Sequence, residues 1–258
     1  MVRGGPILLI LGAAQDGGVP HAGCRARCCE AAWADPARRR DPACAAIIDP
    51  ATGRRWMIDC TPRFPEQLRR LEETSPRGDG APLDGIFLTH AHVGHYAGLI
   101  HLGREAMGTR GVPVHAMPRM ASFLRTQGPW GQLVSLGNVD LRPLEDGRAV
   151  PLSEGLSVTP FAVPHRGEYS ETVGFRVAGS RCSALYLPDI DTWDRWDTPL
   201  GEALRGVDVA FLDGTFFDAG ELPGRALAEV PHPLMRDTLL RLAPLPPVER
   251  AKVRFLHL

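Results

Sequence analysis

The stretch that decides the fold is Thr89-His90-Ala91-His92-Val93-Gly94-His95. It follows the apolar run Gly85–Leu88, which is typical of a buried strand. Alternate side chains of an extended segment point the same way, so His90 and His92 can face one cation, while a helical turn brings His95 toward a second. Neutral imidazole binds zinc, and in some sites iron or manganese. A solvent-exposed histidine-rich loop is the alternative interpretation.

Around this stretch the sequence predicts runs of strands with helices between them. We expect strands over residues 7–12, 45–49, 55–59, 83–89, 112–117, 139–163 (with turns at 146–147 and 154–155), 173–177, 183–187, 207–212 and 253–258. Helices are expected over 30–40, 64–73, 96–107, 119–126 and 234–242. This order suits two mixed sheets covered by helices. We expect one domain over residues 1–258, and a last strand that runs to the final residue suggests that C-terminal residues are missing.

Composition narrows the classes of function. The 258 residues are 44% hydrophobic and 23% charged, as in a globular protein. There are 29 basic and 30 acidic residues, so the chain has no excess of positive charge of the kind that attracts nucleic acid. The apolar run over residues 7–11 is too short to span a membrane, and no signal-peptide cleavage site follows it. We therefore expect a cytoplasmic protein with a small-molecule substrate, and assembly into a homo-oligomer is left open.

The histidine cluster resembles the signature His-x-His-x-Asp-His of the metallo-β-lactamase superfamily, with Gly94 in place of the aspartate. Later parts of the chain match the superfamily in order, at His165, Asp189 and His257. The resemblance implies an αββα sandwich of two mixed β-sheets flanked by helices, and a metal site of two halves. The first half would be His90, His92 and His165 with Asp189 at its edge, and the second would be His95, Asp189 and His257.

The glycine at position 94 affects the second half of this site. In the superfamily the missing aspartate is a metal ligand and a hydrogen-bond partner of the attacking water, so we expect the second metal to bind more weakly here. Asp189 is the nearest candidate to take over as the base. Asp191 and Asp213 compete with it for the place of the bridging acid.

A further candidate is His232, which lies between Pro231 and Pro233. With the strand end Phe211–Phe216, it resembles a stretch found in phosphodiesterases and tRNA-processing nucleases of the superfamily. There a histidine assists the leaving group, so His232 is a candidate proton donor and, with Asp189, a candidate catalytic residue. An ordinary loop histidine is the open alternative.

Cysteines form a second cluster, at Cys24, Cys28 and Cys29. With the Gly-rich turn before them, they resemble the pyrroloquinoline quinone biosynthesis protein B family. Related phosphodiesterases of the phosphonate pathway carry structural zinc in the matching loop, commonly spaced Cys-x-Cys-x-x-Cys. Here Ala26 stands at the middle position. We expect these thiolates to bind zinc with His21 or a distant histidine, and reduced, partly buried thiols are the alternative. Cys44, Cys60 and Cys182 are expected to be small core residues.

Three functions follow from these patterns. The first is a zinc-dependent hydrolase with one or two active-site ions, in which a metal-bound hydroxide attacks a phosphodiester, ester or lactone. The second, implied by the narrower resemblance and by Gly94, is an iron-dependent oxygenase or accessory protein of cofactor biosynthesis. The third is a non-enzymatic metal-binding or scaffold protein whose site has decayed.

Overall fold

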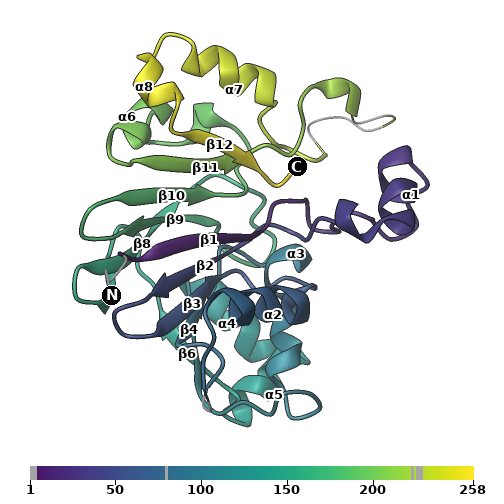
Figure 1. The fold of residues 1–258 in the computed structure, drawn as a ribbon, viewed down its shortest axis with the longest axis vertical. Coiled ribbons are helices and arrows are strands. Elements are labelled where there is room, and N and C mark those ends of the chain that lie inside the picture. The colour runs from purple at the N-terminus through teal and green to yellow at the C-terminus, as the bar shows by residue number, and fades with distance from the viewer. Residues whose placement is uncertain (1–4, 79–80, 222–223, 225–228) are drawn as a thin grey trace. The chain divides into compact units, whose positions relative to one another are not determined.

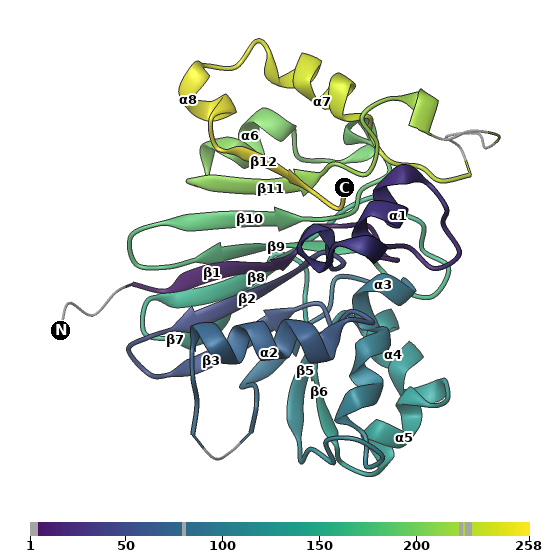
Figure 2. The same ribbon diagram turned by 45° about the vertical axis from the view of Figure 1, so that its right-hand side comes forward.

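The computed structural model describes residues 5–78, 81–221, 224 and 229–258. The chain divides into two compact units, Met1–Leu144 and Glu145–Leu258. Each unit carries one six-stranded sheet with its own helices (Figures 1 and 2). One domain over the whole length therefore stays a prediction.

The first sheet is mixed, with its strands in the order in which they occur in the chain. Strands β1 to β3 are antiparallel, and β3 to β6 are parallel. The strands predicted over 45–49 and 55–59 are confirmed as the antiparallel pair β2 and β3. The strands of this sheet are β1 (Ile7–Gly12), β2 (Cys44–Asp49), β3 (Arg54–Ile58), β4 (Gly85–Phe87), β5 (Val112–Ala116) and β6 (Val139–Pro143).

Short helices accompany this sheet. They are α1 (Arg27–Ala34), α2 (Phe64–Thr74), α3 (Val93–Tyr96), α4 (Pro118–Thr126) and α5 (Trp130–Ser135), with 3-10 turns at Pro36–Arg38 and Ala97–Leu102. The predicted helix over 96–107 is wrong, because α3 ends at Tyr96 and a 3-10 turn follows. Gly98 packs against the chain at Thr61, where a Cβ atom would lie 2.0 Å from the Thr61 carbonyl oxygen. This close approach fixes the path of the turn.

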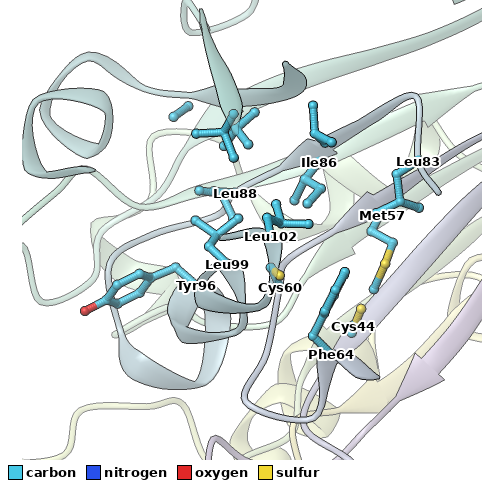
Figure 3. Packing of buried hydrophobic residues seen from close by; sticks show 14 of the residues in the cluster. Cys44, Met57, Cys60, Phe64, Leu83, Ile86, Leu88, Tyr96, Leu99 and Leu102 are labelled. Carbon is cyan, nitrogen blue, oxygen red and sulfur yellow. The ribbon is translucent and has the colours of Figure 1, made fainter. Parts of the chain in front are cut away.

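The core of the first unit packs side chains of the sheet against helices α2, α4 and α5 and the 3-10 turn after α3. Met57, Phe64, Ile86 and Leu99 are fully or almost fully buried in one cluster (Figure 3). Burial of each such side chain stabilises the fold by about 1.5–3 kcal/mol. Cys44 and Cys60 lie in the same cluster, as expected, and burial raises the pKa of both thiols well above the ordinary value, so they stay protonated and unreactive.

The second sheet has the strand order β12-β11-β10-β9-β8-β7. Strands β7 to β10 are antiparallel, whereas β10, β11 and β12 are parallel. Its strands are β7 (Val150–Ser153), β8 (Leu156–Ala162), β9 (Val173–Ala178), β10 (Ser183–Leu187), β11 (Val209–Asp213) and β12 (Val253–Leu256), and its helices are α6 (Leu200–Arg205), α7 (Met235–Leu242) and α8 (Pro247–Arg250).

The core of the second unit gathers Leu187, Ile190, Leu204, Leu212 and Leu242. Cys182 is exposed just before β10, so its predicted place in the core is wrong. Across the ranges that the structure describes, no helix combines the length and the apolar character needed to cross a lipid bilayer.

Candidate metal centre

In the first unit the candidate residues follow the C-terminal ends of two parallel strands. Asp59 comes directly after β3, and Thr89 and His90 come shortly after β4. Parallel strands present their carboxyl ends at one edge of a sheet, which is where α/β proteins place their sites. Helix α3 then brings His95 back toward this edge, as the sequence predicted.

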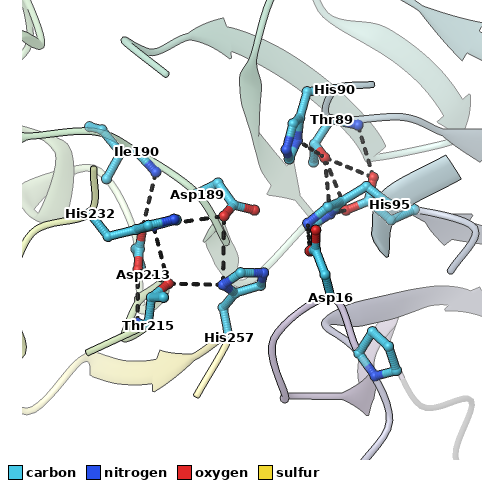
Figure 4. Close-up of polar contacts among 12 residues, drawn as sticks. Asp16, Thr89, His90, His95, Asp189, Ile190, Asp213, Thr215, His232 and His257 are labelled. Atoms are coloured by element: carbon cyan, nitrogen blue, oxygen red, sulfur yellow. Dashed lines mark hydrogen bonds and ion pairs between the residues drawn. The ribbon is translucent and has the colours of Figure 1, made fainter. Parts of the chain in front are cut away.

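Asp59 organises this edge. Its fully buried carboxylate accepts hydrogen bonds from the Thr89 backbone nitrogen and the Thr89 hydroxyl, each at 2.9 Å, and lies 2.8 Å from His95 Nδ1 (Figure 4). Burial raises the pKa of Asp59, while the His95 ring and the Thr89 bonds oppose that rise. The backbone of Asp59 has φ 67°, a left-handed conformation that L-residues rarely adopt outside functional or strained sites.

These bonds determine which ring nitrogens remain for a metal. The Thr89 hydroxyl donates to Asp59, so it accepts from His90 Nδ1 at 3.0 Å. His95 Nδ1 likewise donates to Asp59. In both rings Nε2 is therefore the nitrogen with a lone pair for a cation, and the outer partner fixes the ring orientation. The His90 ring centre lies 4.4 Å from that of His92 and 4.3 Å from that of His95, so the structure brings these histidines together.

Asp16 was not predicted. It lies in the Gly-rich turn after β1, and its Oδ1 is 3.2 Å from His95 Nε2 (Figure 4). A carboxylate therefore faces the nitrogen that His95 offers to a metal. In the sequence the only signal was an acid within a turn rich in glycine, and acids are common in turns.

The second unit has the same arrangement of a buried aspartate, a threonine and two histidines at the ends of its parallel strands. Asp213, at the end of β11, is fully buried and accepts from the Thr215 backbone nitrogen at 2.9 Å and the Thr215 hydroxyl at 2.7 Å. It also accepts from the Ile190 backbone nitrogen at 3.1 Å (Figure 4). Because the Thr215 hydroxyl donates to Asp213, it accepts from His257 Nδ1 at 2.9 Å, which fixes the orientation of the His257 ring.

His232 is the second histidine on Asp213. Its Nδ1 lies 2.7 Å from Asp213 Oδ2, and the ring is buried. Burial alone would lower the pKa of His232, but the Asp213 carboxylate, with a smaller contribution from Asp189, raises it above the ordinary value of 6.5. With Nδ1 held by Asp213, Nε2 is the atom from which the ring can give a proton.

The three candidate acids of the second unit have different partners. Asp213 holds His232, and Asp191 Oδ1 lies 2.9 Å from His165 Nδ1. Asp189 is buried and follows β10. One of its carboxylate oxygens lies within 4.8 Å of a ring nitrogen of His165 and of one of His232, and these two nitrogens are equally close to each other. Among the three, Asp189 is the acid that lies in a group of possible metal donors within this unit, and its role as a ligand stays a prediction.

A model of the beta-lactamase superfamily domain matches residues 54–251. The chain belongs to the beta-lactamase superfamily. Coenzyme PQQ synthesis protein B of Methylobacterium radiotolerans is 30% identical, and the match covers 81% of this chain and 72% of that protein. The protein of the same name from Methylorubrum extorquens strain PA1 is 27% identical over 83% of this chain and 75% of its own length.

Solved structures agree with this assignment. Zn(2+)-bound PqqB from Methylobacterium extorquens matches with a TM-score of 0.79 at 23% identity, covering 97% of this chain and 88% of that one. A diphosphatase from the PhnP family matches with a TM-score of 0.69 at 27% identity, covering 98% and 86%. The predicted superfamily, the narrower resemblance and the metallo-β-lactamase fold are thus confirmed.

The cysteine cluster of this superfamily member is not gathered around one point. Cys28 and Cys29 are neighbours on α1, where successive side chains point about 100° apart, and Cys28 is exposed while Cys29 is buried. Cys29 Sγ accepts from the His21 backbone nitrogen at 3.3 Å, and Cys24 Sγ accepts from the Ala26 nitrogen at 3.4 Å. Within the described ranges no thiol joins a group of three metal-donor atoms within 4.8 Å, so the structural zinc stays a prediction.

Proposed function

We propose that this chain is a metal-dependent hydrolase whose substrate is a small phosphodiester, with esters and lactones as further classes to test. The observation that carries the proposal is the buried pair of His232 and Asp213, 2.7 Å apart and close to Asp189. A protonated histidine beside metal ligands suits a reaction in which a leaving oxygen needs a proton. The 27% identity to a diphosphatase supports a phosphorus-containing substrate.

The residues fit a divalent cation. Three histidines, His90, His95 and His257, each have Nδ1 hydrogen-bonded to a hydroxyl or a carboxylate, so each ring would bind a cation through Nε2. Neutral imidazoles combined with carboxylates suit zinc, iron or manganese. We propose two ions, one held by His90, His92 and His165, the other by His95, Asp189 and His257. When bound, such an ion lowers the pKa of a coordinated water to about 7 and polarises the substrate oxygen it contacts.

The chain's own residues supply the remaining chemistry. His232 gives the proton on Nε2 to the leaving oxygen, and Asp213 holds Nδ1, so the ring keeps its orientation and its positive charge is balanced. The Thr215 hydroxyl and the Ile190 nitrogen fix the Asp213 carboxylate in turn. A proton donor of this kind contributes about 10²–10⁴-fold to the rate.

A leaving-group series tests this role. Zinc- or manganese-loaded His232→Gln should lose about 10²–10⁴-fold in kcat on an alkyl phosphodiester, but much less on a bis(p-nitrophenyl) ester, whose leaving group needs no proton. His101→Gln, which removes a histidine of the 3-10 turn after α3, is the matched control and should keep its activity. If wild-type protein loaded with zinc, manganese or iron shows no turnover above His90→Ala on phosphodiesters, esters and lactones, the hydrolase proposal is wrong.

A second candidate is an iron-dependent oxygenase or accessory protein in cofactor biosynthesis. It is favoured by the 30% identity to coenzyme PQQ synthesis protein B over 81% of the chain. Iron as the metal retained by protein produced with ample iron and zinc, together with oxygen uptake on a tyrosine-like substrate, would favour this candidate over the hydrolase. Zinc retained alone, without oxygen uptake, would count against it.

A further inference from the structure

Position 94 is filled by another residue's side chain. A Cβ atom built on Gly94 would lie 2.2 Å from Asp16 Oδ1, 2.4 Å from Asp16 Cγ and 2.6 Å from Asp16 Cα. Contacts below 3.0 Å are essentially never made by real Cβ atoms, and the Asp16 Cα belongs to the backbone. Any side chain at position 94 would therefore have to push the Asp16 turn away. The aspartate expected in the signature is absent, and a different aspartate stands in its space.

The Asp16 carboxylate faces His95 Nε2, the ring nitrogen that would bind a metal. Asp16 Oδ1 is 3.2 Å from His95 Nε2, while His95 Nδ1 donates to Asp59 (Figure 4). A lone pair on Nε2 and a carboxylate oxygen repel each other unless a proton or a cation lies between them. Two ligands of one zinc-like ion, with bonds of about 2.0–2.2 Å, are separated by about 2.8–3.6 Å at angles between 90° and tetrahedral. The observed separation falls within that range.

The turn that carries Asp16 is held in place by its backbone. The Gly18 nitrogen donates to the Gln15 oxygen at 2.8 Å, which closes the turn around Asp16. On either side, Ala14 and Val19 donate to the carbonyl oxygens of Asp41 and Arg40. Gly18 has φ 66°, which a residue with a side chain rarely adopts. The sequence Gln15-Asp16-Gly17-Gly18 thus fixes the backbone position from which the carboxylate reaches His95.

We propose that Asp16 supplies, from the turn after β1, the carboxylate that the metal signature lacks at Gly94, and that Asp16 and His95 bind the second divalent cation together. This inference rests on the proposed metal-dependent function. It replaces the expectation that Gly94 weakens the second half of the site and leaves Asp189 to compensate. Positions 16 and 94 are then one functional unit, in which only one residue at a time can carry the acid.

An exchange of the acid between the two positions tests the proposal. We compare wild type, Asp16→Asn, Gly94→Asp and the double variant Asp16→Gly/Gly94→Asp. Asp194→Asn, which removes an exposed carboxylate of the second unit, controls for the change in net charge. The readouts are cobalt and zinc bound per chain after equilibrium dialysis, calorimetric Kd, the visible absorption of bound Co²⁺, and thermal unfolding of the metal-free proteins.

We expect Asp16→Asn to fold normally and to bind the second equivalent about 100-fold or more weakly, because even the loss of an outer hydrogen-bond partner costs about 10–100-fold. Gly94→Asp alone should lower the Tm and the affinity, since its Cβ meets Asp16. The double variant should regain part of both, because the loss of the Asp16 side chain relieves the contacts with Cγ and Oδ1 but keeps the 2.6 Å contact with the Cα. The control should match wild type.

An Asp16→Asn variant that binds every equivalent with wild-type Kd would overturn the role of Asp16 and leave the metal-dependent function standing. A double variant that keeps the wild-type Tm but binds no more tightly than Asp16→Asn would also overturn it. Wild-type protein that binds no divalent cation would instead refute the proposed function itself.

Discussion

The buried Asp59 offers a way to change the proposed metal site without substituting any of its proposed ligands. Asp59→Asn keeps an oxygen for the Thr89 backbone nitrogen and hydroxyl, but it turns an NH₂ group toward His95 Nδ1. To accept from that group, His95 must carry its proton on Nε2 instead. The ring then presents an N–H where the proposed metal needs a lone pair.

The magnitudes follow from these contacts. Burial raises the pKa of Asp59, so the ionised carboxylate is a cost to folding, and the neutral amide relieves that cost while it loses a charged hydrogen bond. The two effects oppose each other, and we expect the free energy of unfolding of the metal-free protein to change by less than about 2 kcal/mol. Metal affinity should fall about 10–100-fold, as for other outer partners of ligating histidines.

The assay separates the two effects. Urea unfolding of the metal-free protein measures stability, and calorimetric titration with Zn²⁺ measures affinity. Asp59→Ala is the comparison, because it leaves the Thr89 N–H and hydroxyl buried without an acceptor and should destabilise the fold by about 2–5 kcal/mol. If Asp59→Asn binds Zn²⁺ with wild-type Kd, the reasoning about the His95 tautomer is refuted.

Two further predictions concern the first unit. Gly98→Ala should destabilise the fold by about 2–3 kcal/mol, because its Cβ would lie 2.0 Å from the Thr61 carbonyl oxygen, whereas Gly78→Ala, which meets nothing within 4 Å, should have almost no effect on the midpoint of urea unfolding. His115 stacks on Phe87 at 4.3 Å, and burial, helped by Arg142, lowers its pKa to about 4. The unfolded chain takes up this proton below about pH 6.5 and the folded chain only near pH 4, so stability is lost as the pH falls through that window, by about 3 kcal/mol in total. His115→Phe should lose less stability than wild type between pH 7 and 4, and parallel losses would contradict the assignment.

The sequence was most informative where the contacts are local. His90, His92 and His95 are close in the chain, so the alternation of a strand and one helical turn was enough to predict their common orientation. Asp189 could be favoured because it follows an apolar strand. Asp59 and Asp16 could not be placed, because they meet His95 from segments far away in the chain. An acid after a strand or within a Gly-rich turn is common without any site.

The helix predicted over 96–107 failed for a related reason. The apolar spacing of this segment suits a helix, but Gly98 has to pack against the carbonyl of Thr61, and that requirement comes from another part of the chain. A tertiary contact thus decided the local structure. Helix propensities summed along the segment do not include contacts with other parts of the chain, so they could not predict it.

The same polar device recurs in both units and explains why the histidines are constrained so strongly. In each unit one fully buried aspartate, Asp59 or Asp213, accepts hydrogen bonds from the backbone nitrogen and the hydroxyl of a threonine. One histidine then contacts the aspartate and another contacts the threonine hydroxyl, each through Nδ1. A carboxylate with no exposure is costly to bury, and a fold made only for stability would do better with apolar residues. The benefit of this arrangement is a fixed orientation of the imidazole rings, because each ring is held through Nδ1 and points Nε2 away from the aspartate and threonine. Position 16 extends the same logic, since a carboxylate at a turn held by its backbone meets Nε2 of a ring held by its other nitrogen.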